Sequence, residues 1–164
     1  MQRVPITMEG FRRLEKELGD LKNERPEVIE AIKVAREEGD LRENAGYEAA
    51  RDRQGMLEAR IRYIESRLAT SQVIDLNTQC GDKVIFGATV EIEDVNSGEV
   101  KTWTLLGPDE AEPSKGSISL LSPVGQAMLG KSEGDEITVD APRGRISYEI
   151  VSIRFNGCPT PPKA

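Results

Sequence analysis

Two carboxylates, Asp40 and Glu43, have the residue types and the spacing best suited to chemistry in this sequence. They stand three positions apart at the expected start of a helix, which places both side chains on one side of it. Hard carboxylate oxygens suit Mg²⁺, but this ion prefers about six oxygen ligands in octahedral geometry. Two carboxylates cannot complete such a site, so a Mg²⁺ ion bound here would need a partner molecule to supply its other ligands.

The same spacing also has a purely structural interpretation. An Asp followed three residues later by a Glu forms a capping box, and the helix dipole favours negative charge at this end. From the spacing alone, the helix-capping interpretation is favoured over the Mg²⁺ site. The two interpretations are compatible, because a capping carboxylate can still face solvent.

Four arginines flank this stretch of the chain: Arg36, Arg42, Arg51 and Arg53. A planar guanidinium suits phosphate, so these side chains can contact nucleic acid locally. The alternative is ion pairing with neighbouring carboxylates, which the sequence places at Glu37, Glu48 and Asp52. The chain has no histidine, the commonest general base, and no visible nucleophile–base pair. We therefore expect a protein that is not an enzyme by itself.

Two helices must position these residues, because apolar side chains recur at steps of three and four on both sides of them. This period predicts a coiled-coil seam, and the few residues between its halves predict an antiparallel hairpin. We expect a first helix from about Thr7 to Glu38, roughly 45 Å long. Gly39 would end it, and Pro26 should bend or break it near Lys22–Glu24. The seam positions are Phe11, Leu14, Leu18, Leu21, Val28, Ile32 and Ala35, then Tyr47, Ala50, Gln54, Leu57, Ile61, Ile64 and Leu68, with Arg25 interrupting the first run.

From Ser71 the apolar period changes to two, which predicts strands and a second domain. One short helix interrupts them, with Ser122 as its cap, Pro123 in its first turn and Gly130 after its end. The fold class is therefore α+β: a helical hairpin over residues 1–75, an antiparallel sheet domain with one helix over 76–155, and a disordered proline-rich tail over 156–164. The expected strands are Lys83–Phe86, Ala88–Glu93, Lys101–Leu106, Ser117–Leu120, Glu136–Val139 and Arg145–Ile153.

The net charge of −7 excludes a bulk nucleic-acid binder, since non-specific binding rests on a cationic surface. Cys80 and Cys158 are the only cysteines and form no zinc motif. We expect them to be reduced thiols in a cytoplasmic protein. No apolar run approaches the roughly 18 residues of a membrane span, and we expect no association with membranes.

The stretch Ala35–Arg51 closely resembles the tip of the bacterial transcript-cleavage factors of the Gre family. The resemblance covers nearly the whole chain to about Phe155, and the acidic charge resembles the more acidic of the family's two main types. Four further stretches carry it: Thr7–Gly10, Val84–Val90, Ile118–Gly125, and Leu129–Lys131 followed by Gly134–Asp135.

The resemblance implies an N-terminal coiled coil and a C-terminal FKBP-like domain that docks on RNA polymerase at its secondary channel. The coiled coil enters the channel and stimulates the polymerase to cleave the 3′ end of nascent RNA in backtracked, arrested complexes. Asp40 and Glu43 match the tip carboxylates that hold a Mg²⁺ ion shared with polymerase and not bound stably alone. Arg36 and Arg51 match a basic patch near the RNA. We also expect the protein to be a monomer when it is not bound to polymerase.

Two residues depart from the family pattern, since Gly46 and Glu48 stand where a glutamate and a histidine are expected. Two other functions stay open. One is an inhibitory homologue that occludes the channel, although such tips carry more carboxylates than Asp40 and Glu43. The other is an FKBP-like peptidyl-prolyl isomerase or chaperone, which needs an aromatic-lined pocket for proline. The aromatic residues of the second domain look too few and scattered for one: Phe86, Trp103, Tyr148 and Phe155.

Overall fold

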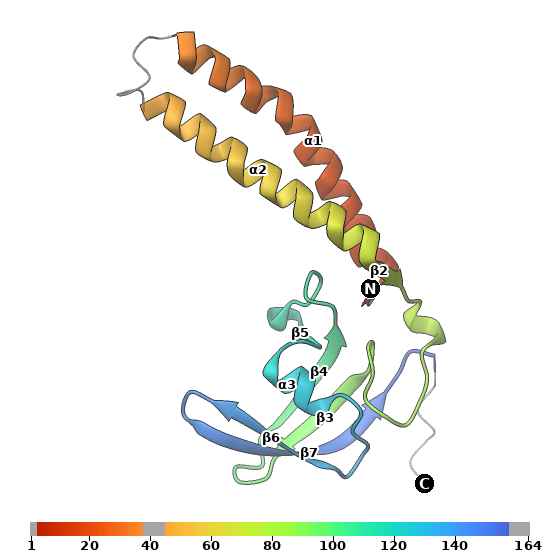
Figure 1. Ribbon diagram of the computed structural model, residues 1–164. Coiled ribbons are helices and arrows are strands. Elements are labelled where there is room, and N and C mark those ends of the chain that lie inside the picture. Colours follow the sequence, from red (N-terminus) through yellow and green to blue (C-terminus); the bar gives the residue numbers. More distant parts are fainter. Residues whose placement is uncertain (1–2, 38–44, 158–164) are drawn as a thin grey trace. The chain divides into compact units, whose positions relative to one another are not determined.

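The structure is a computed structural model that describes residues 3–37 and 45–157. Asp40 and Glu43, and also Gly39 and Arg42, lie outside the described residues. The chain divides into two compact units, which Figure 1 shows in ribbon form. The first contains Glu9–Ser71, and the second contains Val4–Met8 together with the chain from Gln72 onward.

The first unit is the predicted helical hairpin. Helix α1 spans Met8–Glu37 and helix α2 spans Ala45–Thr70, and the two lie side by side in Figure 1. Their facing side chains form one apolar cluster around Val28, Ile32, Leu57 and Ile61. The seam predicted from the 3–4 period is thus confirmed, because all buried positions of both helices except Gly10 fall on it.

Pro26 does not break α1, so of the bend or local break expected near Lys22–Glu24 the break does not occur. A proline removes only one backbone hydrogen bond, and packing of the neighbouring Val28, which is fully buried, retains the helix. Ion pairs across the hairpin add to this packing. They are Arg25–Glu58, Arg53–Glu24, Arg60–Glu17 and Lys22–Glu65.

The second unit is built on a five-stranded sheet of order β5-β4-β3-β7-β6. Most neighbouring strands are antiparallel, as predicted, but β4 and β5 run parallel, so the sheet is mixed. The connection between β4 and β5 passes through the 3₁₀ turn η2, Pro113–Lys115, which returns the chain to the same end of the sheet. The strands are β3 Thr89–Asp94, β4 Val100–Leu106, β5 Ser117–Ser119, β6 Glu136–Ala141 and β7 Gly144–Arg154.

One short helix, α3 (Pro123–Met128), packs near this sheet and carries the predicted signals at its start. The hydroxyl oxygen of Ser122 accepts a hydrogen bond from the backbone N–H of Gly125 at 3.1 Å. Met128 is fully buried in a cluster with the inward-facing residues of the strands, among them Val90, Leu105 and Ile150. Alternation along the strands therefore produces one apolar face, which forms the core of the second unit.

Two short strands lie outside that sheet. Strand β1, Val4–Ile6, pairs with β2, Ser71–Val73, and the backbone N–H of Ile74 donates to the carbonyl of Ile6 at 2.8 Å. A 3₁₀ turn, η1 (Leu76–Thr78), follows β2. Since Ile6 is only 3% exposed, the N-terminal segment is an integral part of the second unit.

Two further expectations are wrong. Lys83–Phe86 is not a strand, because it forms only an isolated bridge between Lys83 and Ser132. Cys80 is disulfide-bonded, which contradicts the expected reduced thiol. The chain's other cysteine, Cys158, lies outside the described residues.

Candidate functional site

A hollow of about 300 Å³ brings together the two arginines that the sequence singled out, Arg36 and Arg51. It lies in the first unit, toward the ends of the helices that flank residues 38–44 of the chain. Helix α1 contributes most of its lining and α2 the rest. The lining residues are Ile29, Ile32, Lys33, Arg36, Glu37, Arg51 and Gln54.

Helical spacing explains this grouping. Ile29, Lys33 and Arg36 follow one another at four and three positions on α1, so they share one face. Arg51 and Gln54 are three apart on α2. Ile32 is buried in the seam, and its packing holds the two faces together. The hollow therefore has an apolar floor and a cationic rim, an arrangement that suits an anionic ligand.

Lys33, Arg36 and Arg51 form no ion pair with any described carboxylate. Arg36 instead lies over the ring of Tyr47, with its guanidinium carbon 5.9 Å from the ring centroid. This cation–π contact orients the guanidinium without neutralising its charge. Among the described residues of the hollow, the acidic residue beside these three cations is Glu37, which offsets part of their charge.

The rest of the hairpin is electrostatically different. Arg25 donates two hydrogen bonds to Glu58, and these raise the pKa of Arg25 and lower the pKa of Glu58 from its ordinary value of 4.5. Arg53, one of the four flanking arginines, pairs with Glu24. The ion-pair interpretation is therefore correct for Arg53, although Glu24 was not among the partners expected. For Arg36 and Arg51 no such pair is found in the described part of the chain.

Lys33 is the residue that sequence reasoning missed. Its signal was available, because Lys33 precedes Arg36 by three positions and so lies on the same helical face. The predicted site carboxylates Asp40 and Glu43 belong to residues 38–44, which lie outside the described part of the chain. Among the described residues no group of three or more His, Cys, Asp or Glu side chains can hold a metal ion.

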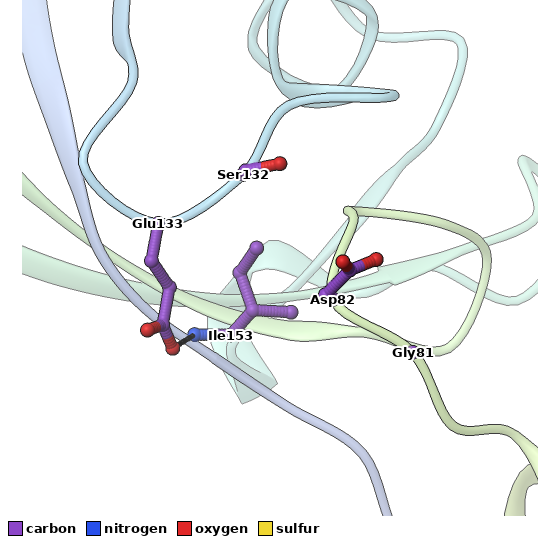
Figure 2. A pocket seen from close by; sticks show the side chains of 5 residues that line it. All are labelled: Gly81, Asp82, Ser132, Glu133 and Ile153. Carbon is purple, nitrogen blue, oxygen red and sulfur yellow. Dashed lines mark hydrogen bonds between the residues drawn. The ribbon is translucent and has the colours of Figure 1, made fainter.

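A second hollow, of about 320 Å³, lies in the second unit and is open to solvent (Figure 2). Its lining residues come from two loops and the end of β7: Gly81, Asp82, Ser132, Glu133 and Ile153. Figure 2 shows the Glu133 carboxylate turned toward the backbone of Ile153, whose N–H donates to it at 2.9 Å. The lining contains no aromatic residue and no nucleophile–base pair, so this hollow is the weaker candidate.

None of the helices that the structure describes is both long and apolar enough to cross a membrane. The described chain thus consists of a helical hairpin, whose hollow is lined by cations that pair with no described carboxylate, and a separate sheet domain. Family models agree with this division. Residues 4–73 match the model described as "Transcription elongation factor, N-terminal", and residues 78–155 match "Transcription elongation factor, GreA/GreB, C-term".

The chain is also similar to curated relatives along almost its whole length. It is 76% identical to the transcription elongation factor GreA of Solidesulfovibrio magneticus, with 96% of each chain covered. It is 69% identical to the GreA of Desulfovibrio desulfuricans, covering 96% of this chain and 97% of that relative. Among solved structures, GreA factor homolog 1 of Thermus thermophilus is 30% identical, with a TM-score of 0.44, over 93% of this chain and 99% of that one. The chain therefore belongs to the GreA/GreB family of transcription elongation factors.

Proposed function

We propose that this protein binds bacterial RNA polymerase, inserts its helical hairpin into the secondary channel, and stimulates cleavage of the nascent RNA 3′ end in backtracked complexes. The polymerase performs the hydrolysis, and this protein supplies groups to its active centre. The observation that carries the proposal is the hollow lined by Lys33, Arg36 and Arg51, which pair with no described carboxylate, in a chain that belongs to a family of elongation factors.

The length of the hairpin supports a role at a recessed site. The 30 residues of α1 correspond to roughly 45 Å at the usual helical rise. Its apolar seam and its cross-helix ion pairs stiffen the hairpin along this length. A stiff arm can carry residues at its end into a channel that a globular domain cannot enter.

The cations of the hollow would contact the extruded RNA. Phosphate oxygens accept hydrogen bonds from guanidinium and ammonium groups, and the potential of unpaired cations attracts the backbone over short distances. Because Arg36 lies over the Tyr47 ring, its guanidinium is oriented before the ligand arrives. The chain as a whole is acidic, so this attraction is local to the hollow.

Asp40 and Glu43 fit a metal site that polymerase completes. Their oxygens are the ligands that Mg²⁺ prefers, but two side chains leave most of its coordination positions to others. Asp40 and Glu43 would hold Mg²⁺ together with ligands from polymerase, and the bound ion would supply Lewis-acid chemistry for phosphodiester hydrolysis. The two carboxylates would also help to orient the attacking water. The charge of both carboxylates is essential to this role.

The second unit would anchor the protein on polymerase. A prolyl isomerase function finds less support, because Phe86, Tyr148 and Phe155 are at most 7% exposed and belong to the interior. Trp103 packs against the same core. None of these rings lines either of the two hollows.

The test is incubation of the protein with a stalled, backtracked polymerase complex whose RNA is labelled at its 3′ end. We expect short 3′ fragments at a rate well above that of polymerase alone. Absence of extra fragments would refute the proposal. Slower elongation without fragments would instead indicate the inhibitory homologue that occludes the channel.

A further inference from the structure

Cys80 is disulfide-bonded, and the proposed function does not use this bond. No cysteine in the described part of the chain is a free thiol. The sequence contains one other cysteine, Cys158. Within a single chain, a disulfide from Cys80 can therefore lead only to Cys158. The alternative is a bond between the Cys80 residues of two copies of the chain.

The described end of the chain returns to the residue before Cys80. The backbone N–H of Gly157, the last described residue, donates to the carbonyl oxygen of Gln79 at 3.1 Å. A Cβ atom on Gly157 would lie 2.5 Å from that oxygen and 2.7 Å from the carbonyl oxygen of Asn77. A residue without a Cβ atom is thus needed for this close approach of two backbone segments. Both segments belong to the second unit, so the contact lies within one compact unit.

This contact favours a disulfide from Cys80 to the residue after Gly157. Consecutive Cα atoms are about 3.8 Å apart, and the two Cα atoms of a disulfide are commonly about 5 to 6 Å apart. Cys80 follows Gln79 directly, and Cys158 follows Gly157 directly. A backbone hydrogen bond between the two preceding residues is therefore compatible with a disulfide between the cysteines.

Both of these segments carry residues that pack into the second unit. Phe155, two positions before Gly157, is 6% exposed and belongs to the core cluster. Leu76, at the start of η1, lies so close to Gly87 that a Cβ atom on Gly87 would be 2.6 Å from its Cδ2 atom. Chain ends fray unless they are tied down. A covalent link at Cys80 would therefore hold Phe155 in the core.

Cys80 is exposed, so thiols in solution can reach it. Exposed disulfides are reduced more readily than buried structural ones. In the proposed function, on which this step rests, the protein acts on RNA polymerase inside the cell. Thiol buffers keep most cysteines reduced there, and the disulfides that do form are usually transient and catalytic or redox-sensing. The bond at Cys80 would thus meet conditions in which it can both open and close.

We propose that Cys80 and Cys158 form a redox-sensitive clasp, which ties the end of the second unit to residues 76–79 when oxidised and releases that end when reduced. A low-molecular-weight thiol opens the clasp by exchange. Its thiolate attacks one sulfur and forms a mixed disulfide, and the other cysteine leaves as a thiolate that takes up the proton. A second thiol resolves the mixed disulfide, so two external thiols become one external disulfide and both cysteines become thiols. The external disulfide closes the clasp by the reverse steps.

The first experiment identifies the partner of Cys80. Full-length protein prepared without reductant is alkylated, digested and analysed by mass spectrometry. We expect one linked pair of peptides, containing Cys80 and Cys158, in monomeric protein, and its loss after reduction. Alkylated Cys80, or a link between the Cys80 residues of two copies, would overturn the inference.

The second experiment places the wild-type protein in glutathione buffers of different ratio. We expect the disulfide to be closed at the oxidising poise of a secretory compartment and open at the reducing poise of the cytosol. The same state of the disulfide in both buffers would overturn its role as a redox-sensitive clasp.

The third experiment measures what the clasp holds. We expect the amide hydrogen of Gly157 to exchange about tenfold or more faster in reduced than in oxidised wild type, because a released chain end frays. The midpoint of thermal unfolding of the second unit should fall by about 10 °C on reduction. Cys158→Ser should match reduced wild type with or without thiol, and amides of the hairpin, the internal control, should not change. Equal exchange at Gly157 in both redox states would overturn the inference.

Two glycine variants test whether the contact at Gly157 supports the clasp. Gly157→Ala places a Cβ atom against the carbonyl oxygens of Gln79 and Asn77. Its disulfide should therefore be half reduced at a glutathione ratio shifted about tenfold toward the oxidised side. In Gly81→Ala, beside Cys80, the new Cβ atom meets no atom within 4 Å, so this matched control should behave as wild type.

An unshifted ratio in Gly157→Ala would overturn the inference that this contact supports the clasp. None of these measurements uses polymerase. If the wild-type protein does not stimulate cleavage at all, the proposed function fails, and the state of Cys80 in the glutathione buffers still decides the clasp.

Discussion

The guanidinium of Arg25 donates two hydrogen bonds to the carboxylate of Glu58, from Nε to Oε1 at 2.7 Å and from Nη2 to Oε2 at 2.9 Å. Arg25 stands at the one position where the apolar seam of α1 is interrupted, next to Pro26. The paired fork geometry joins the two helices at this point. An apparent defect in the seam is therefore a specific contact of the hairpin.

This pair predicts a pH dependence of stability. The hydrogen bond from Arg25 lowers the pKa of Glu58 below 4.5, and the charges of Arg25 and Arg62 add to it against the effect of desolvation. A folded-state pKa below the unfolded one stabilises the fold above pH 4.5, and this contribution is lost as pH falls through the folded value. We expect the stability difference between wild type and Glu58→Gln to shrink below pH 4.5. Denaturant titrations of the two proteins from pH 3 to 7 measure it, and a difference independent of pH would contradict the coupling.

For Asp40 and Glu43, the effects of charge and of helix capping can be separated by isosteric substitutions. Asn caps a helix about as well as Asp, and Gln replaces Glu in a capping box, so Asp40→Asn and Glu43→Gln should change stability by no more than about 1 kcal/mol. Loss of either charge should reduce stimulated cleavage by more than about tenfold, with partial recovery at higher Mg²⁺. Cleavage assays and polymerase-binding titrations check this. Wild-type cleavage in both variants would leave the carboxylates as caps only.

The cations of the hollow should act through phosphate. We expect the double variant Arg36→Ala/Arg51→Ala to stimulate cleavage of long extruded RNA less than wild type does. Its cleavage activity should also depend less steeply on salt concentration, when both are plotted as logarithms. Lys33→Ala should have the same effect to a smaller extent. Arg53→Ala is the control, because Arg53 is engaged by Glu24. If the double variant and wild type show the same salt dependence, Arg36 and Arg51 are only solvent-exposed surface residues and do not contact phosphate.

Anchoring and chemistry should reside on different units. A variant in which a flexible linker replaces Glu9–Thr70 retains β1 on the second unit and should bind polymerase without stimulating cleavage. A shorter fragment, 76–164, should be less stable, because it lacks the buried Ile6 and leaves Glu110 without Thr7. Binding titrations and thermal unfolding test both statements. Tight binding by the isolated hairpin would contradict this division.

Two glycines in helices should respond oppositely to alanine. A Cβ atom on Gly125 would lie 2.3 Å from the carbonyl oxygen of Ser119, so Gly125→Ala should lower the unfolding free energy of the second unit by about 2 kcal/mol. Gly55 on α2 has no atom within 4 Å of such a Cβ, so Gly55→Ala should raise the stability of the hairpin by up to about 1 kcal/mol. Hydrogen exchange of amides in each unit measures the two effects separately.

The sequence by itself determined the elements whose signals are local. The hairpin follows from a 3–4 apolar period that any helix must display, and α3 follows from the cap at Ser122 and from Pro123. The resemblance of the tip also depends on adjacent residues alone. It selects Asp40 and Glu43, which lie outside the described residues, and it selects Arg36 and Arg51 together, so the roles of all four residues stay predictions.

Only the tertiary structure decided which polar groups meet. Arg36 and Arg53 look alike in sequence, but the relative register of the two helices brings Glu24 to Arg53 and leaves Arg36 over Tyr47. Lys83–Phe86 has the composition of a strand but lacks a continuous partner, because backbone pairing depends on segments distant in sequence. The bond between Thr7 and Glu110 spans 103 residues. No local pattern encodes such a contact, since it exists only once the chain has folded.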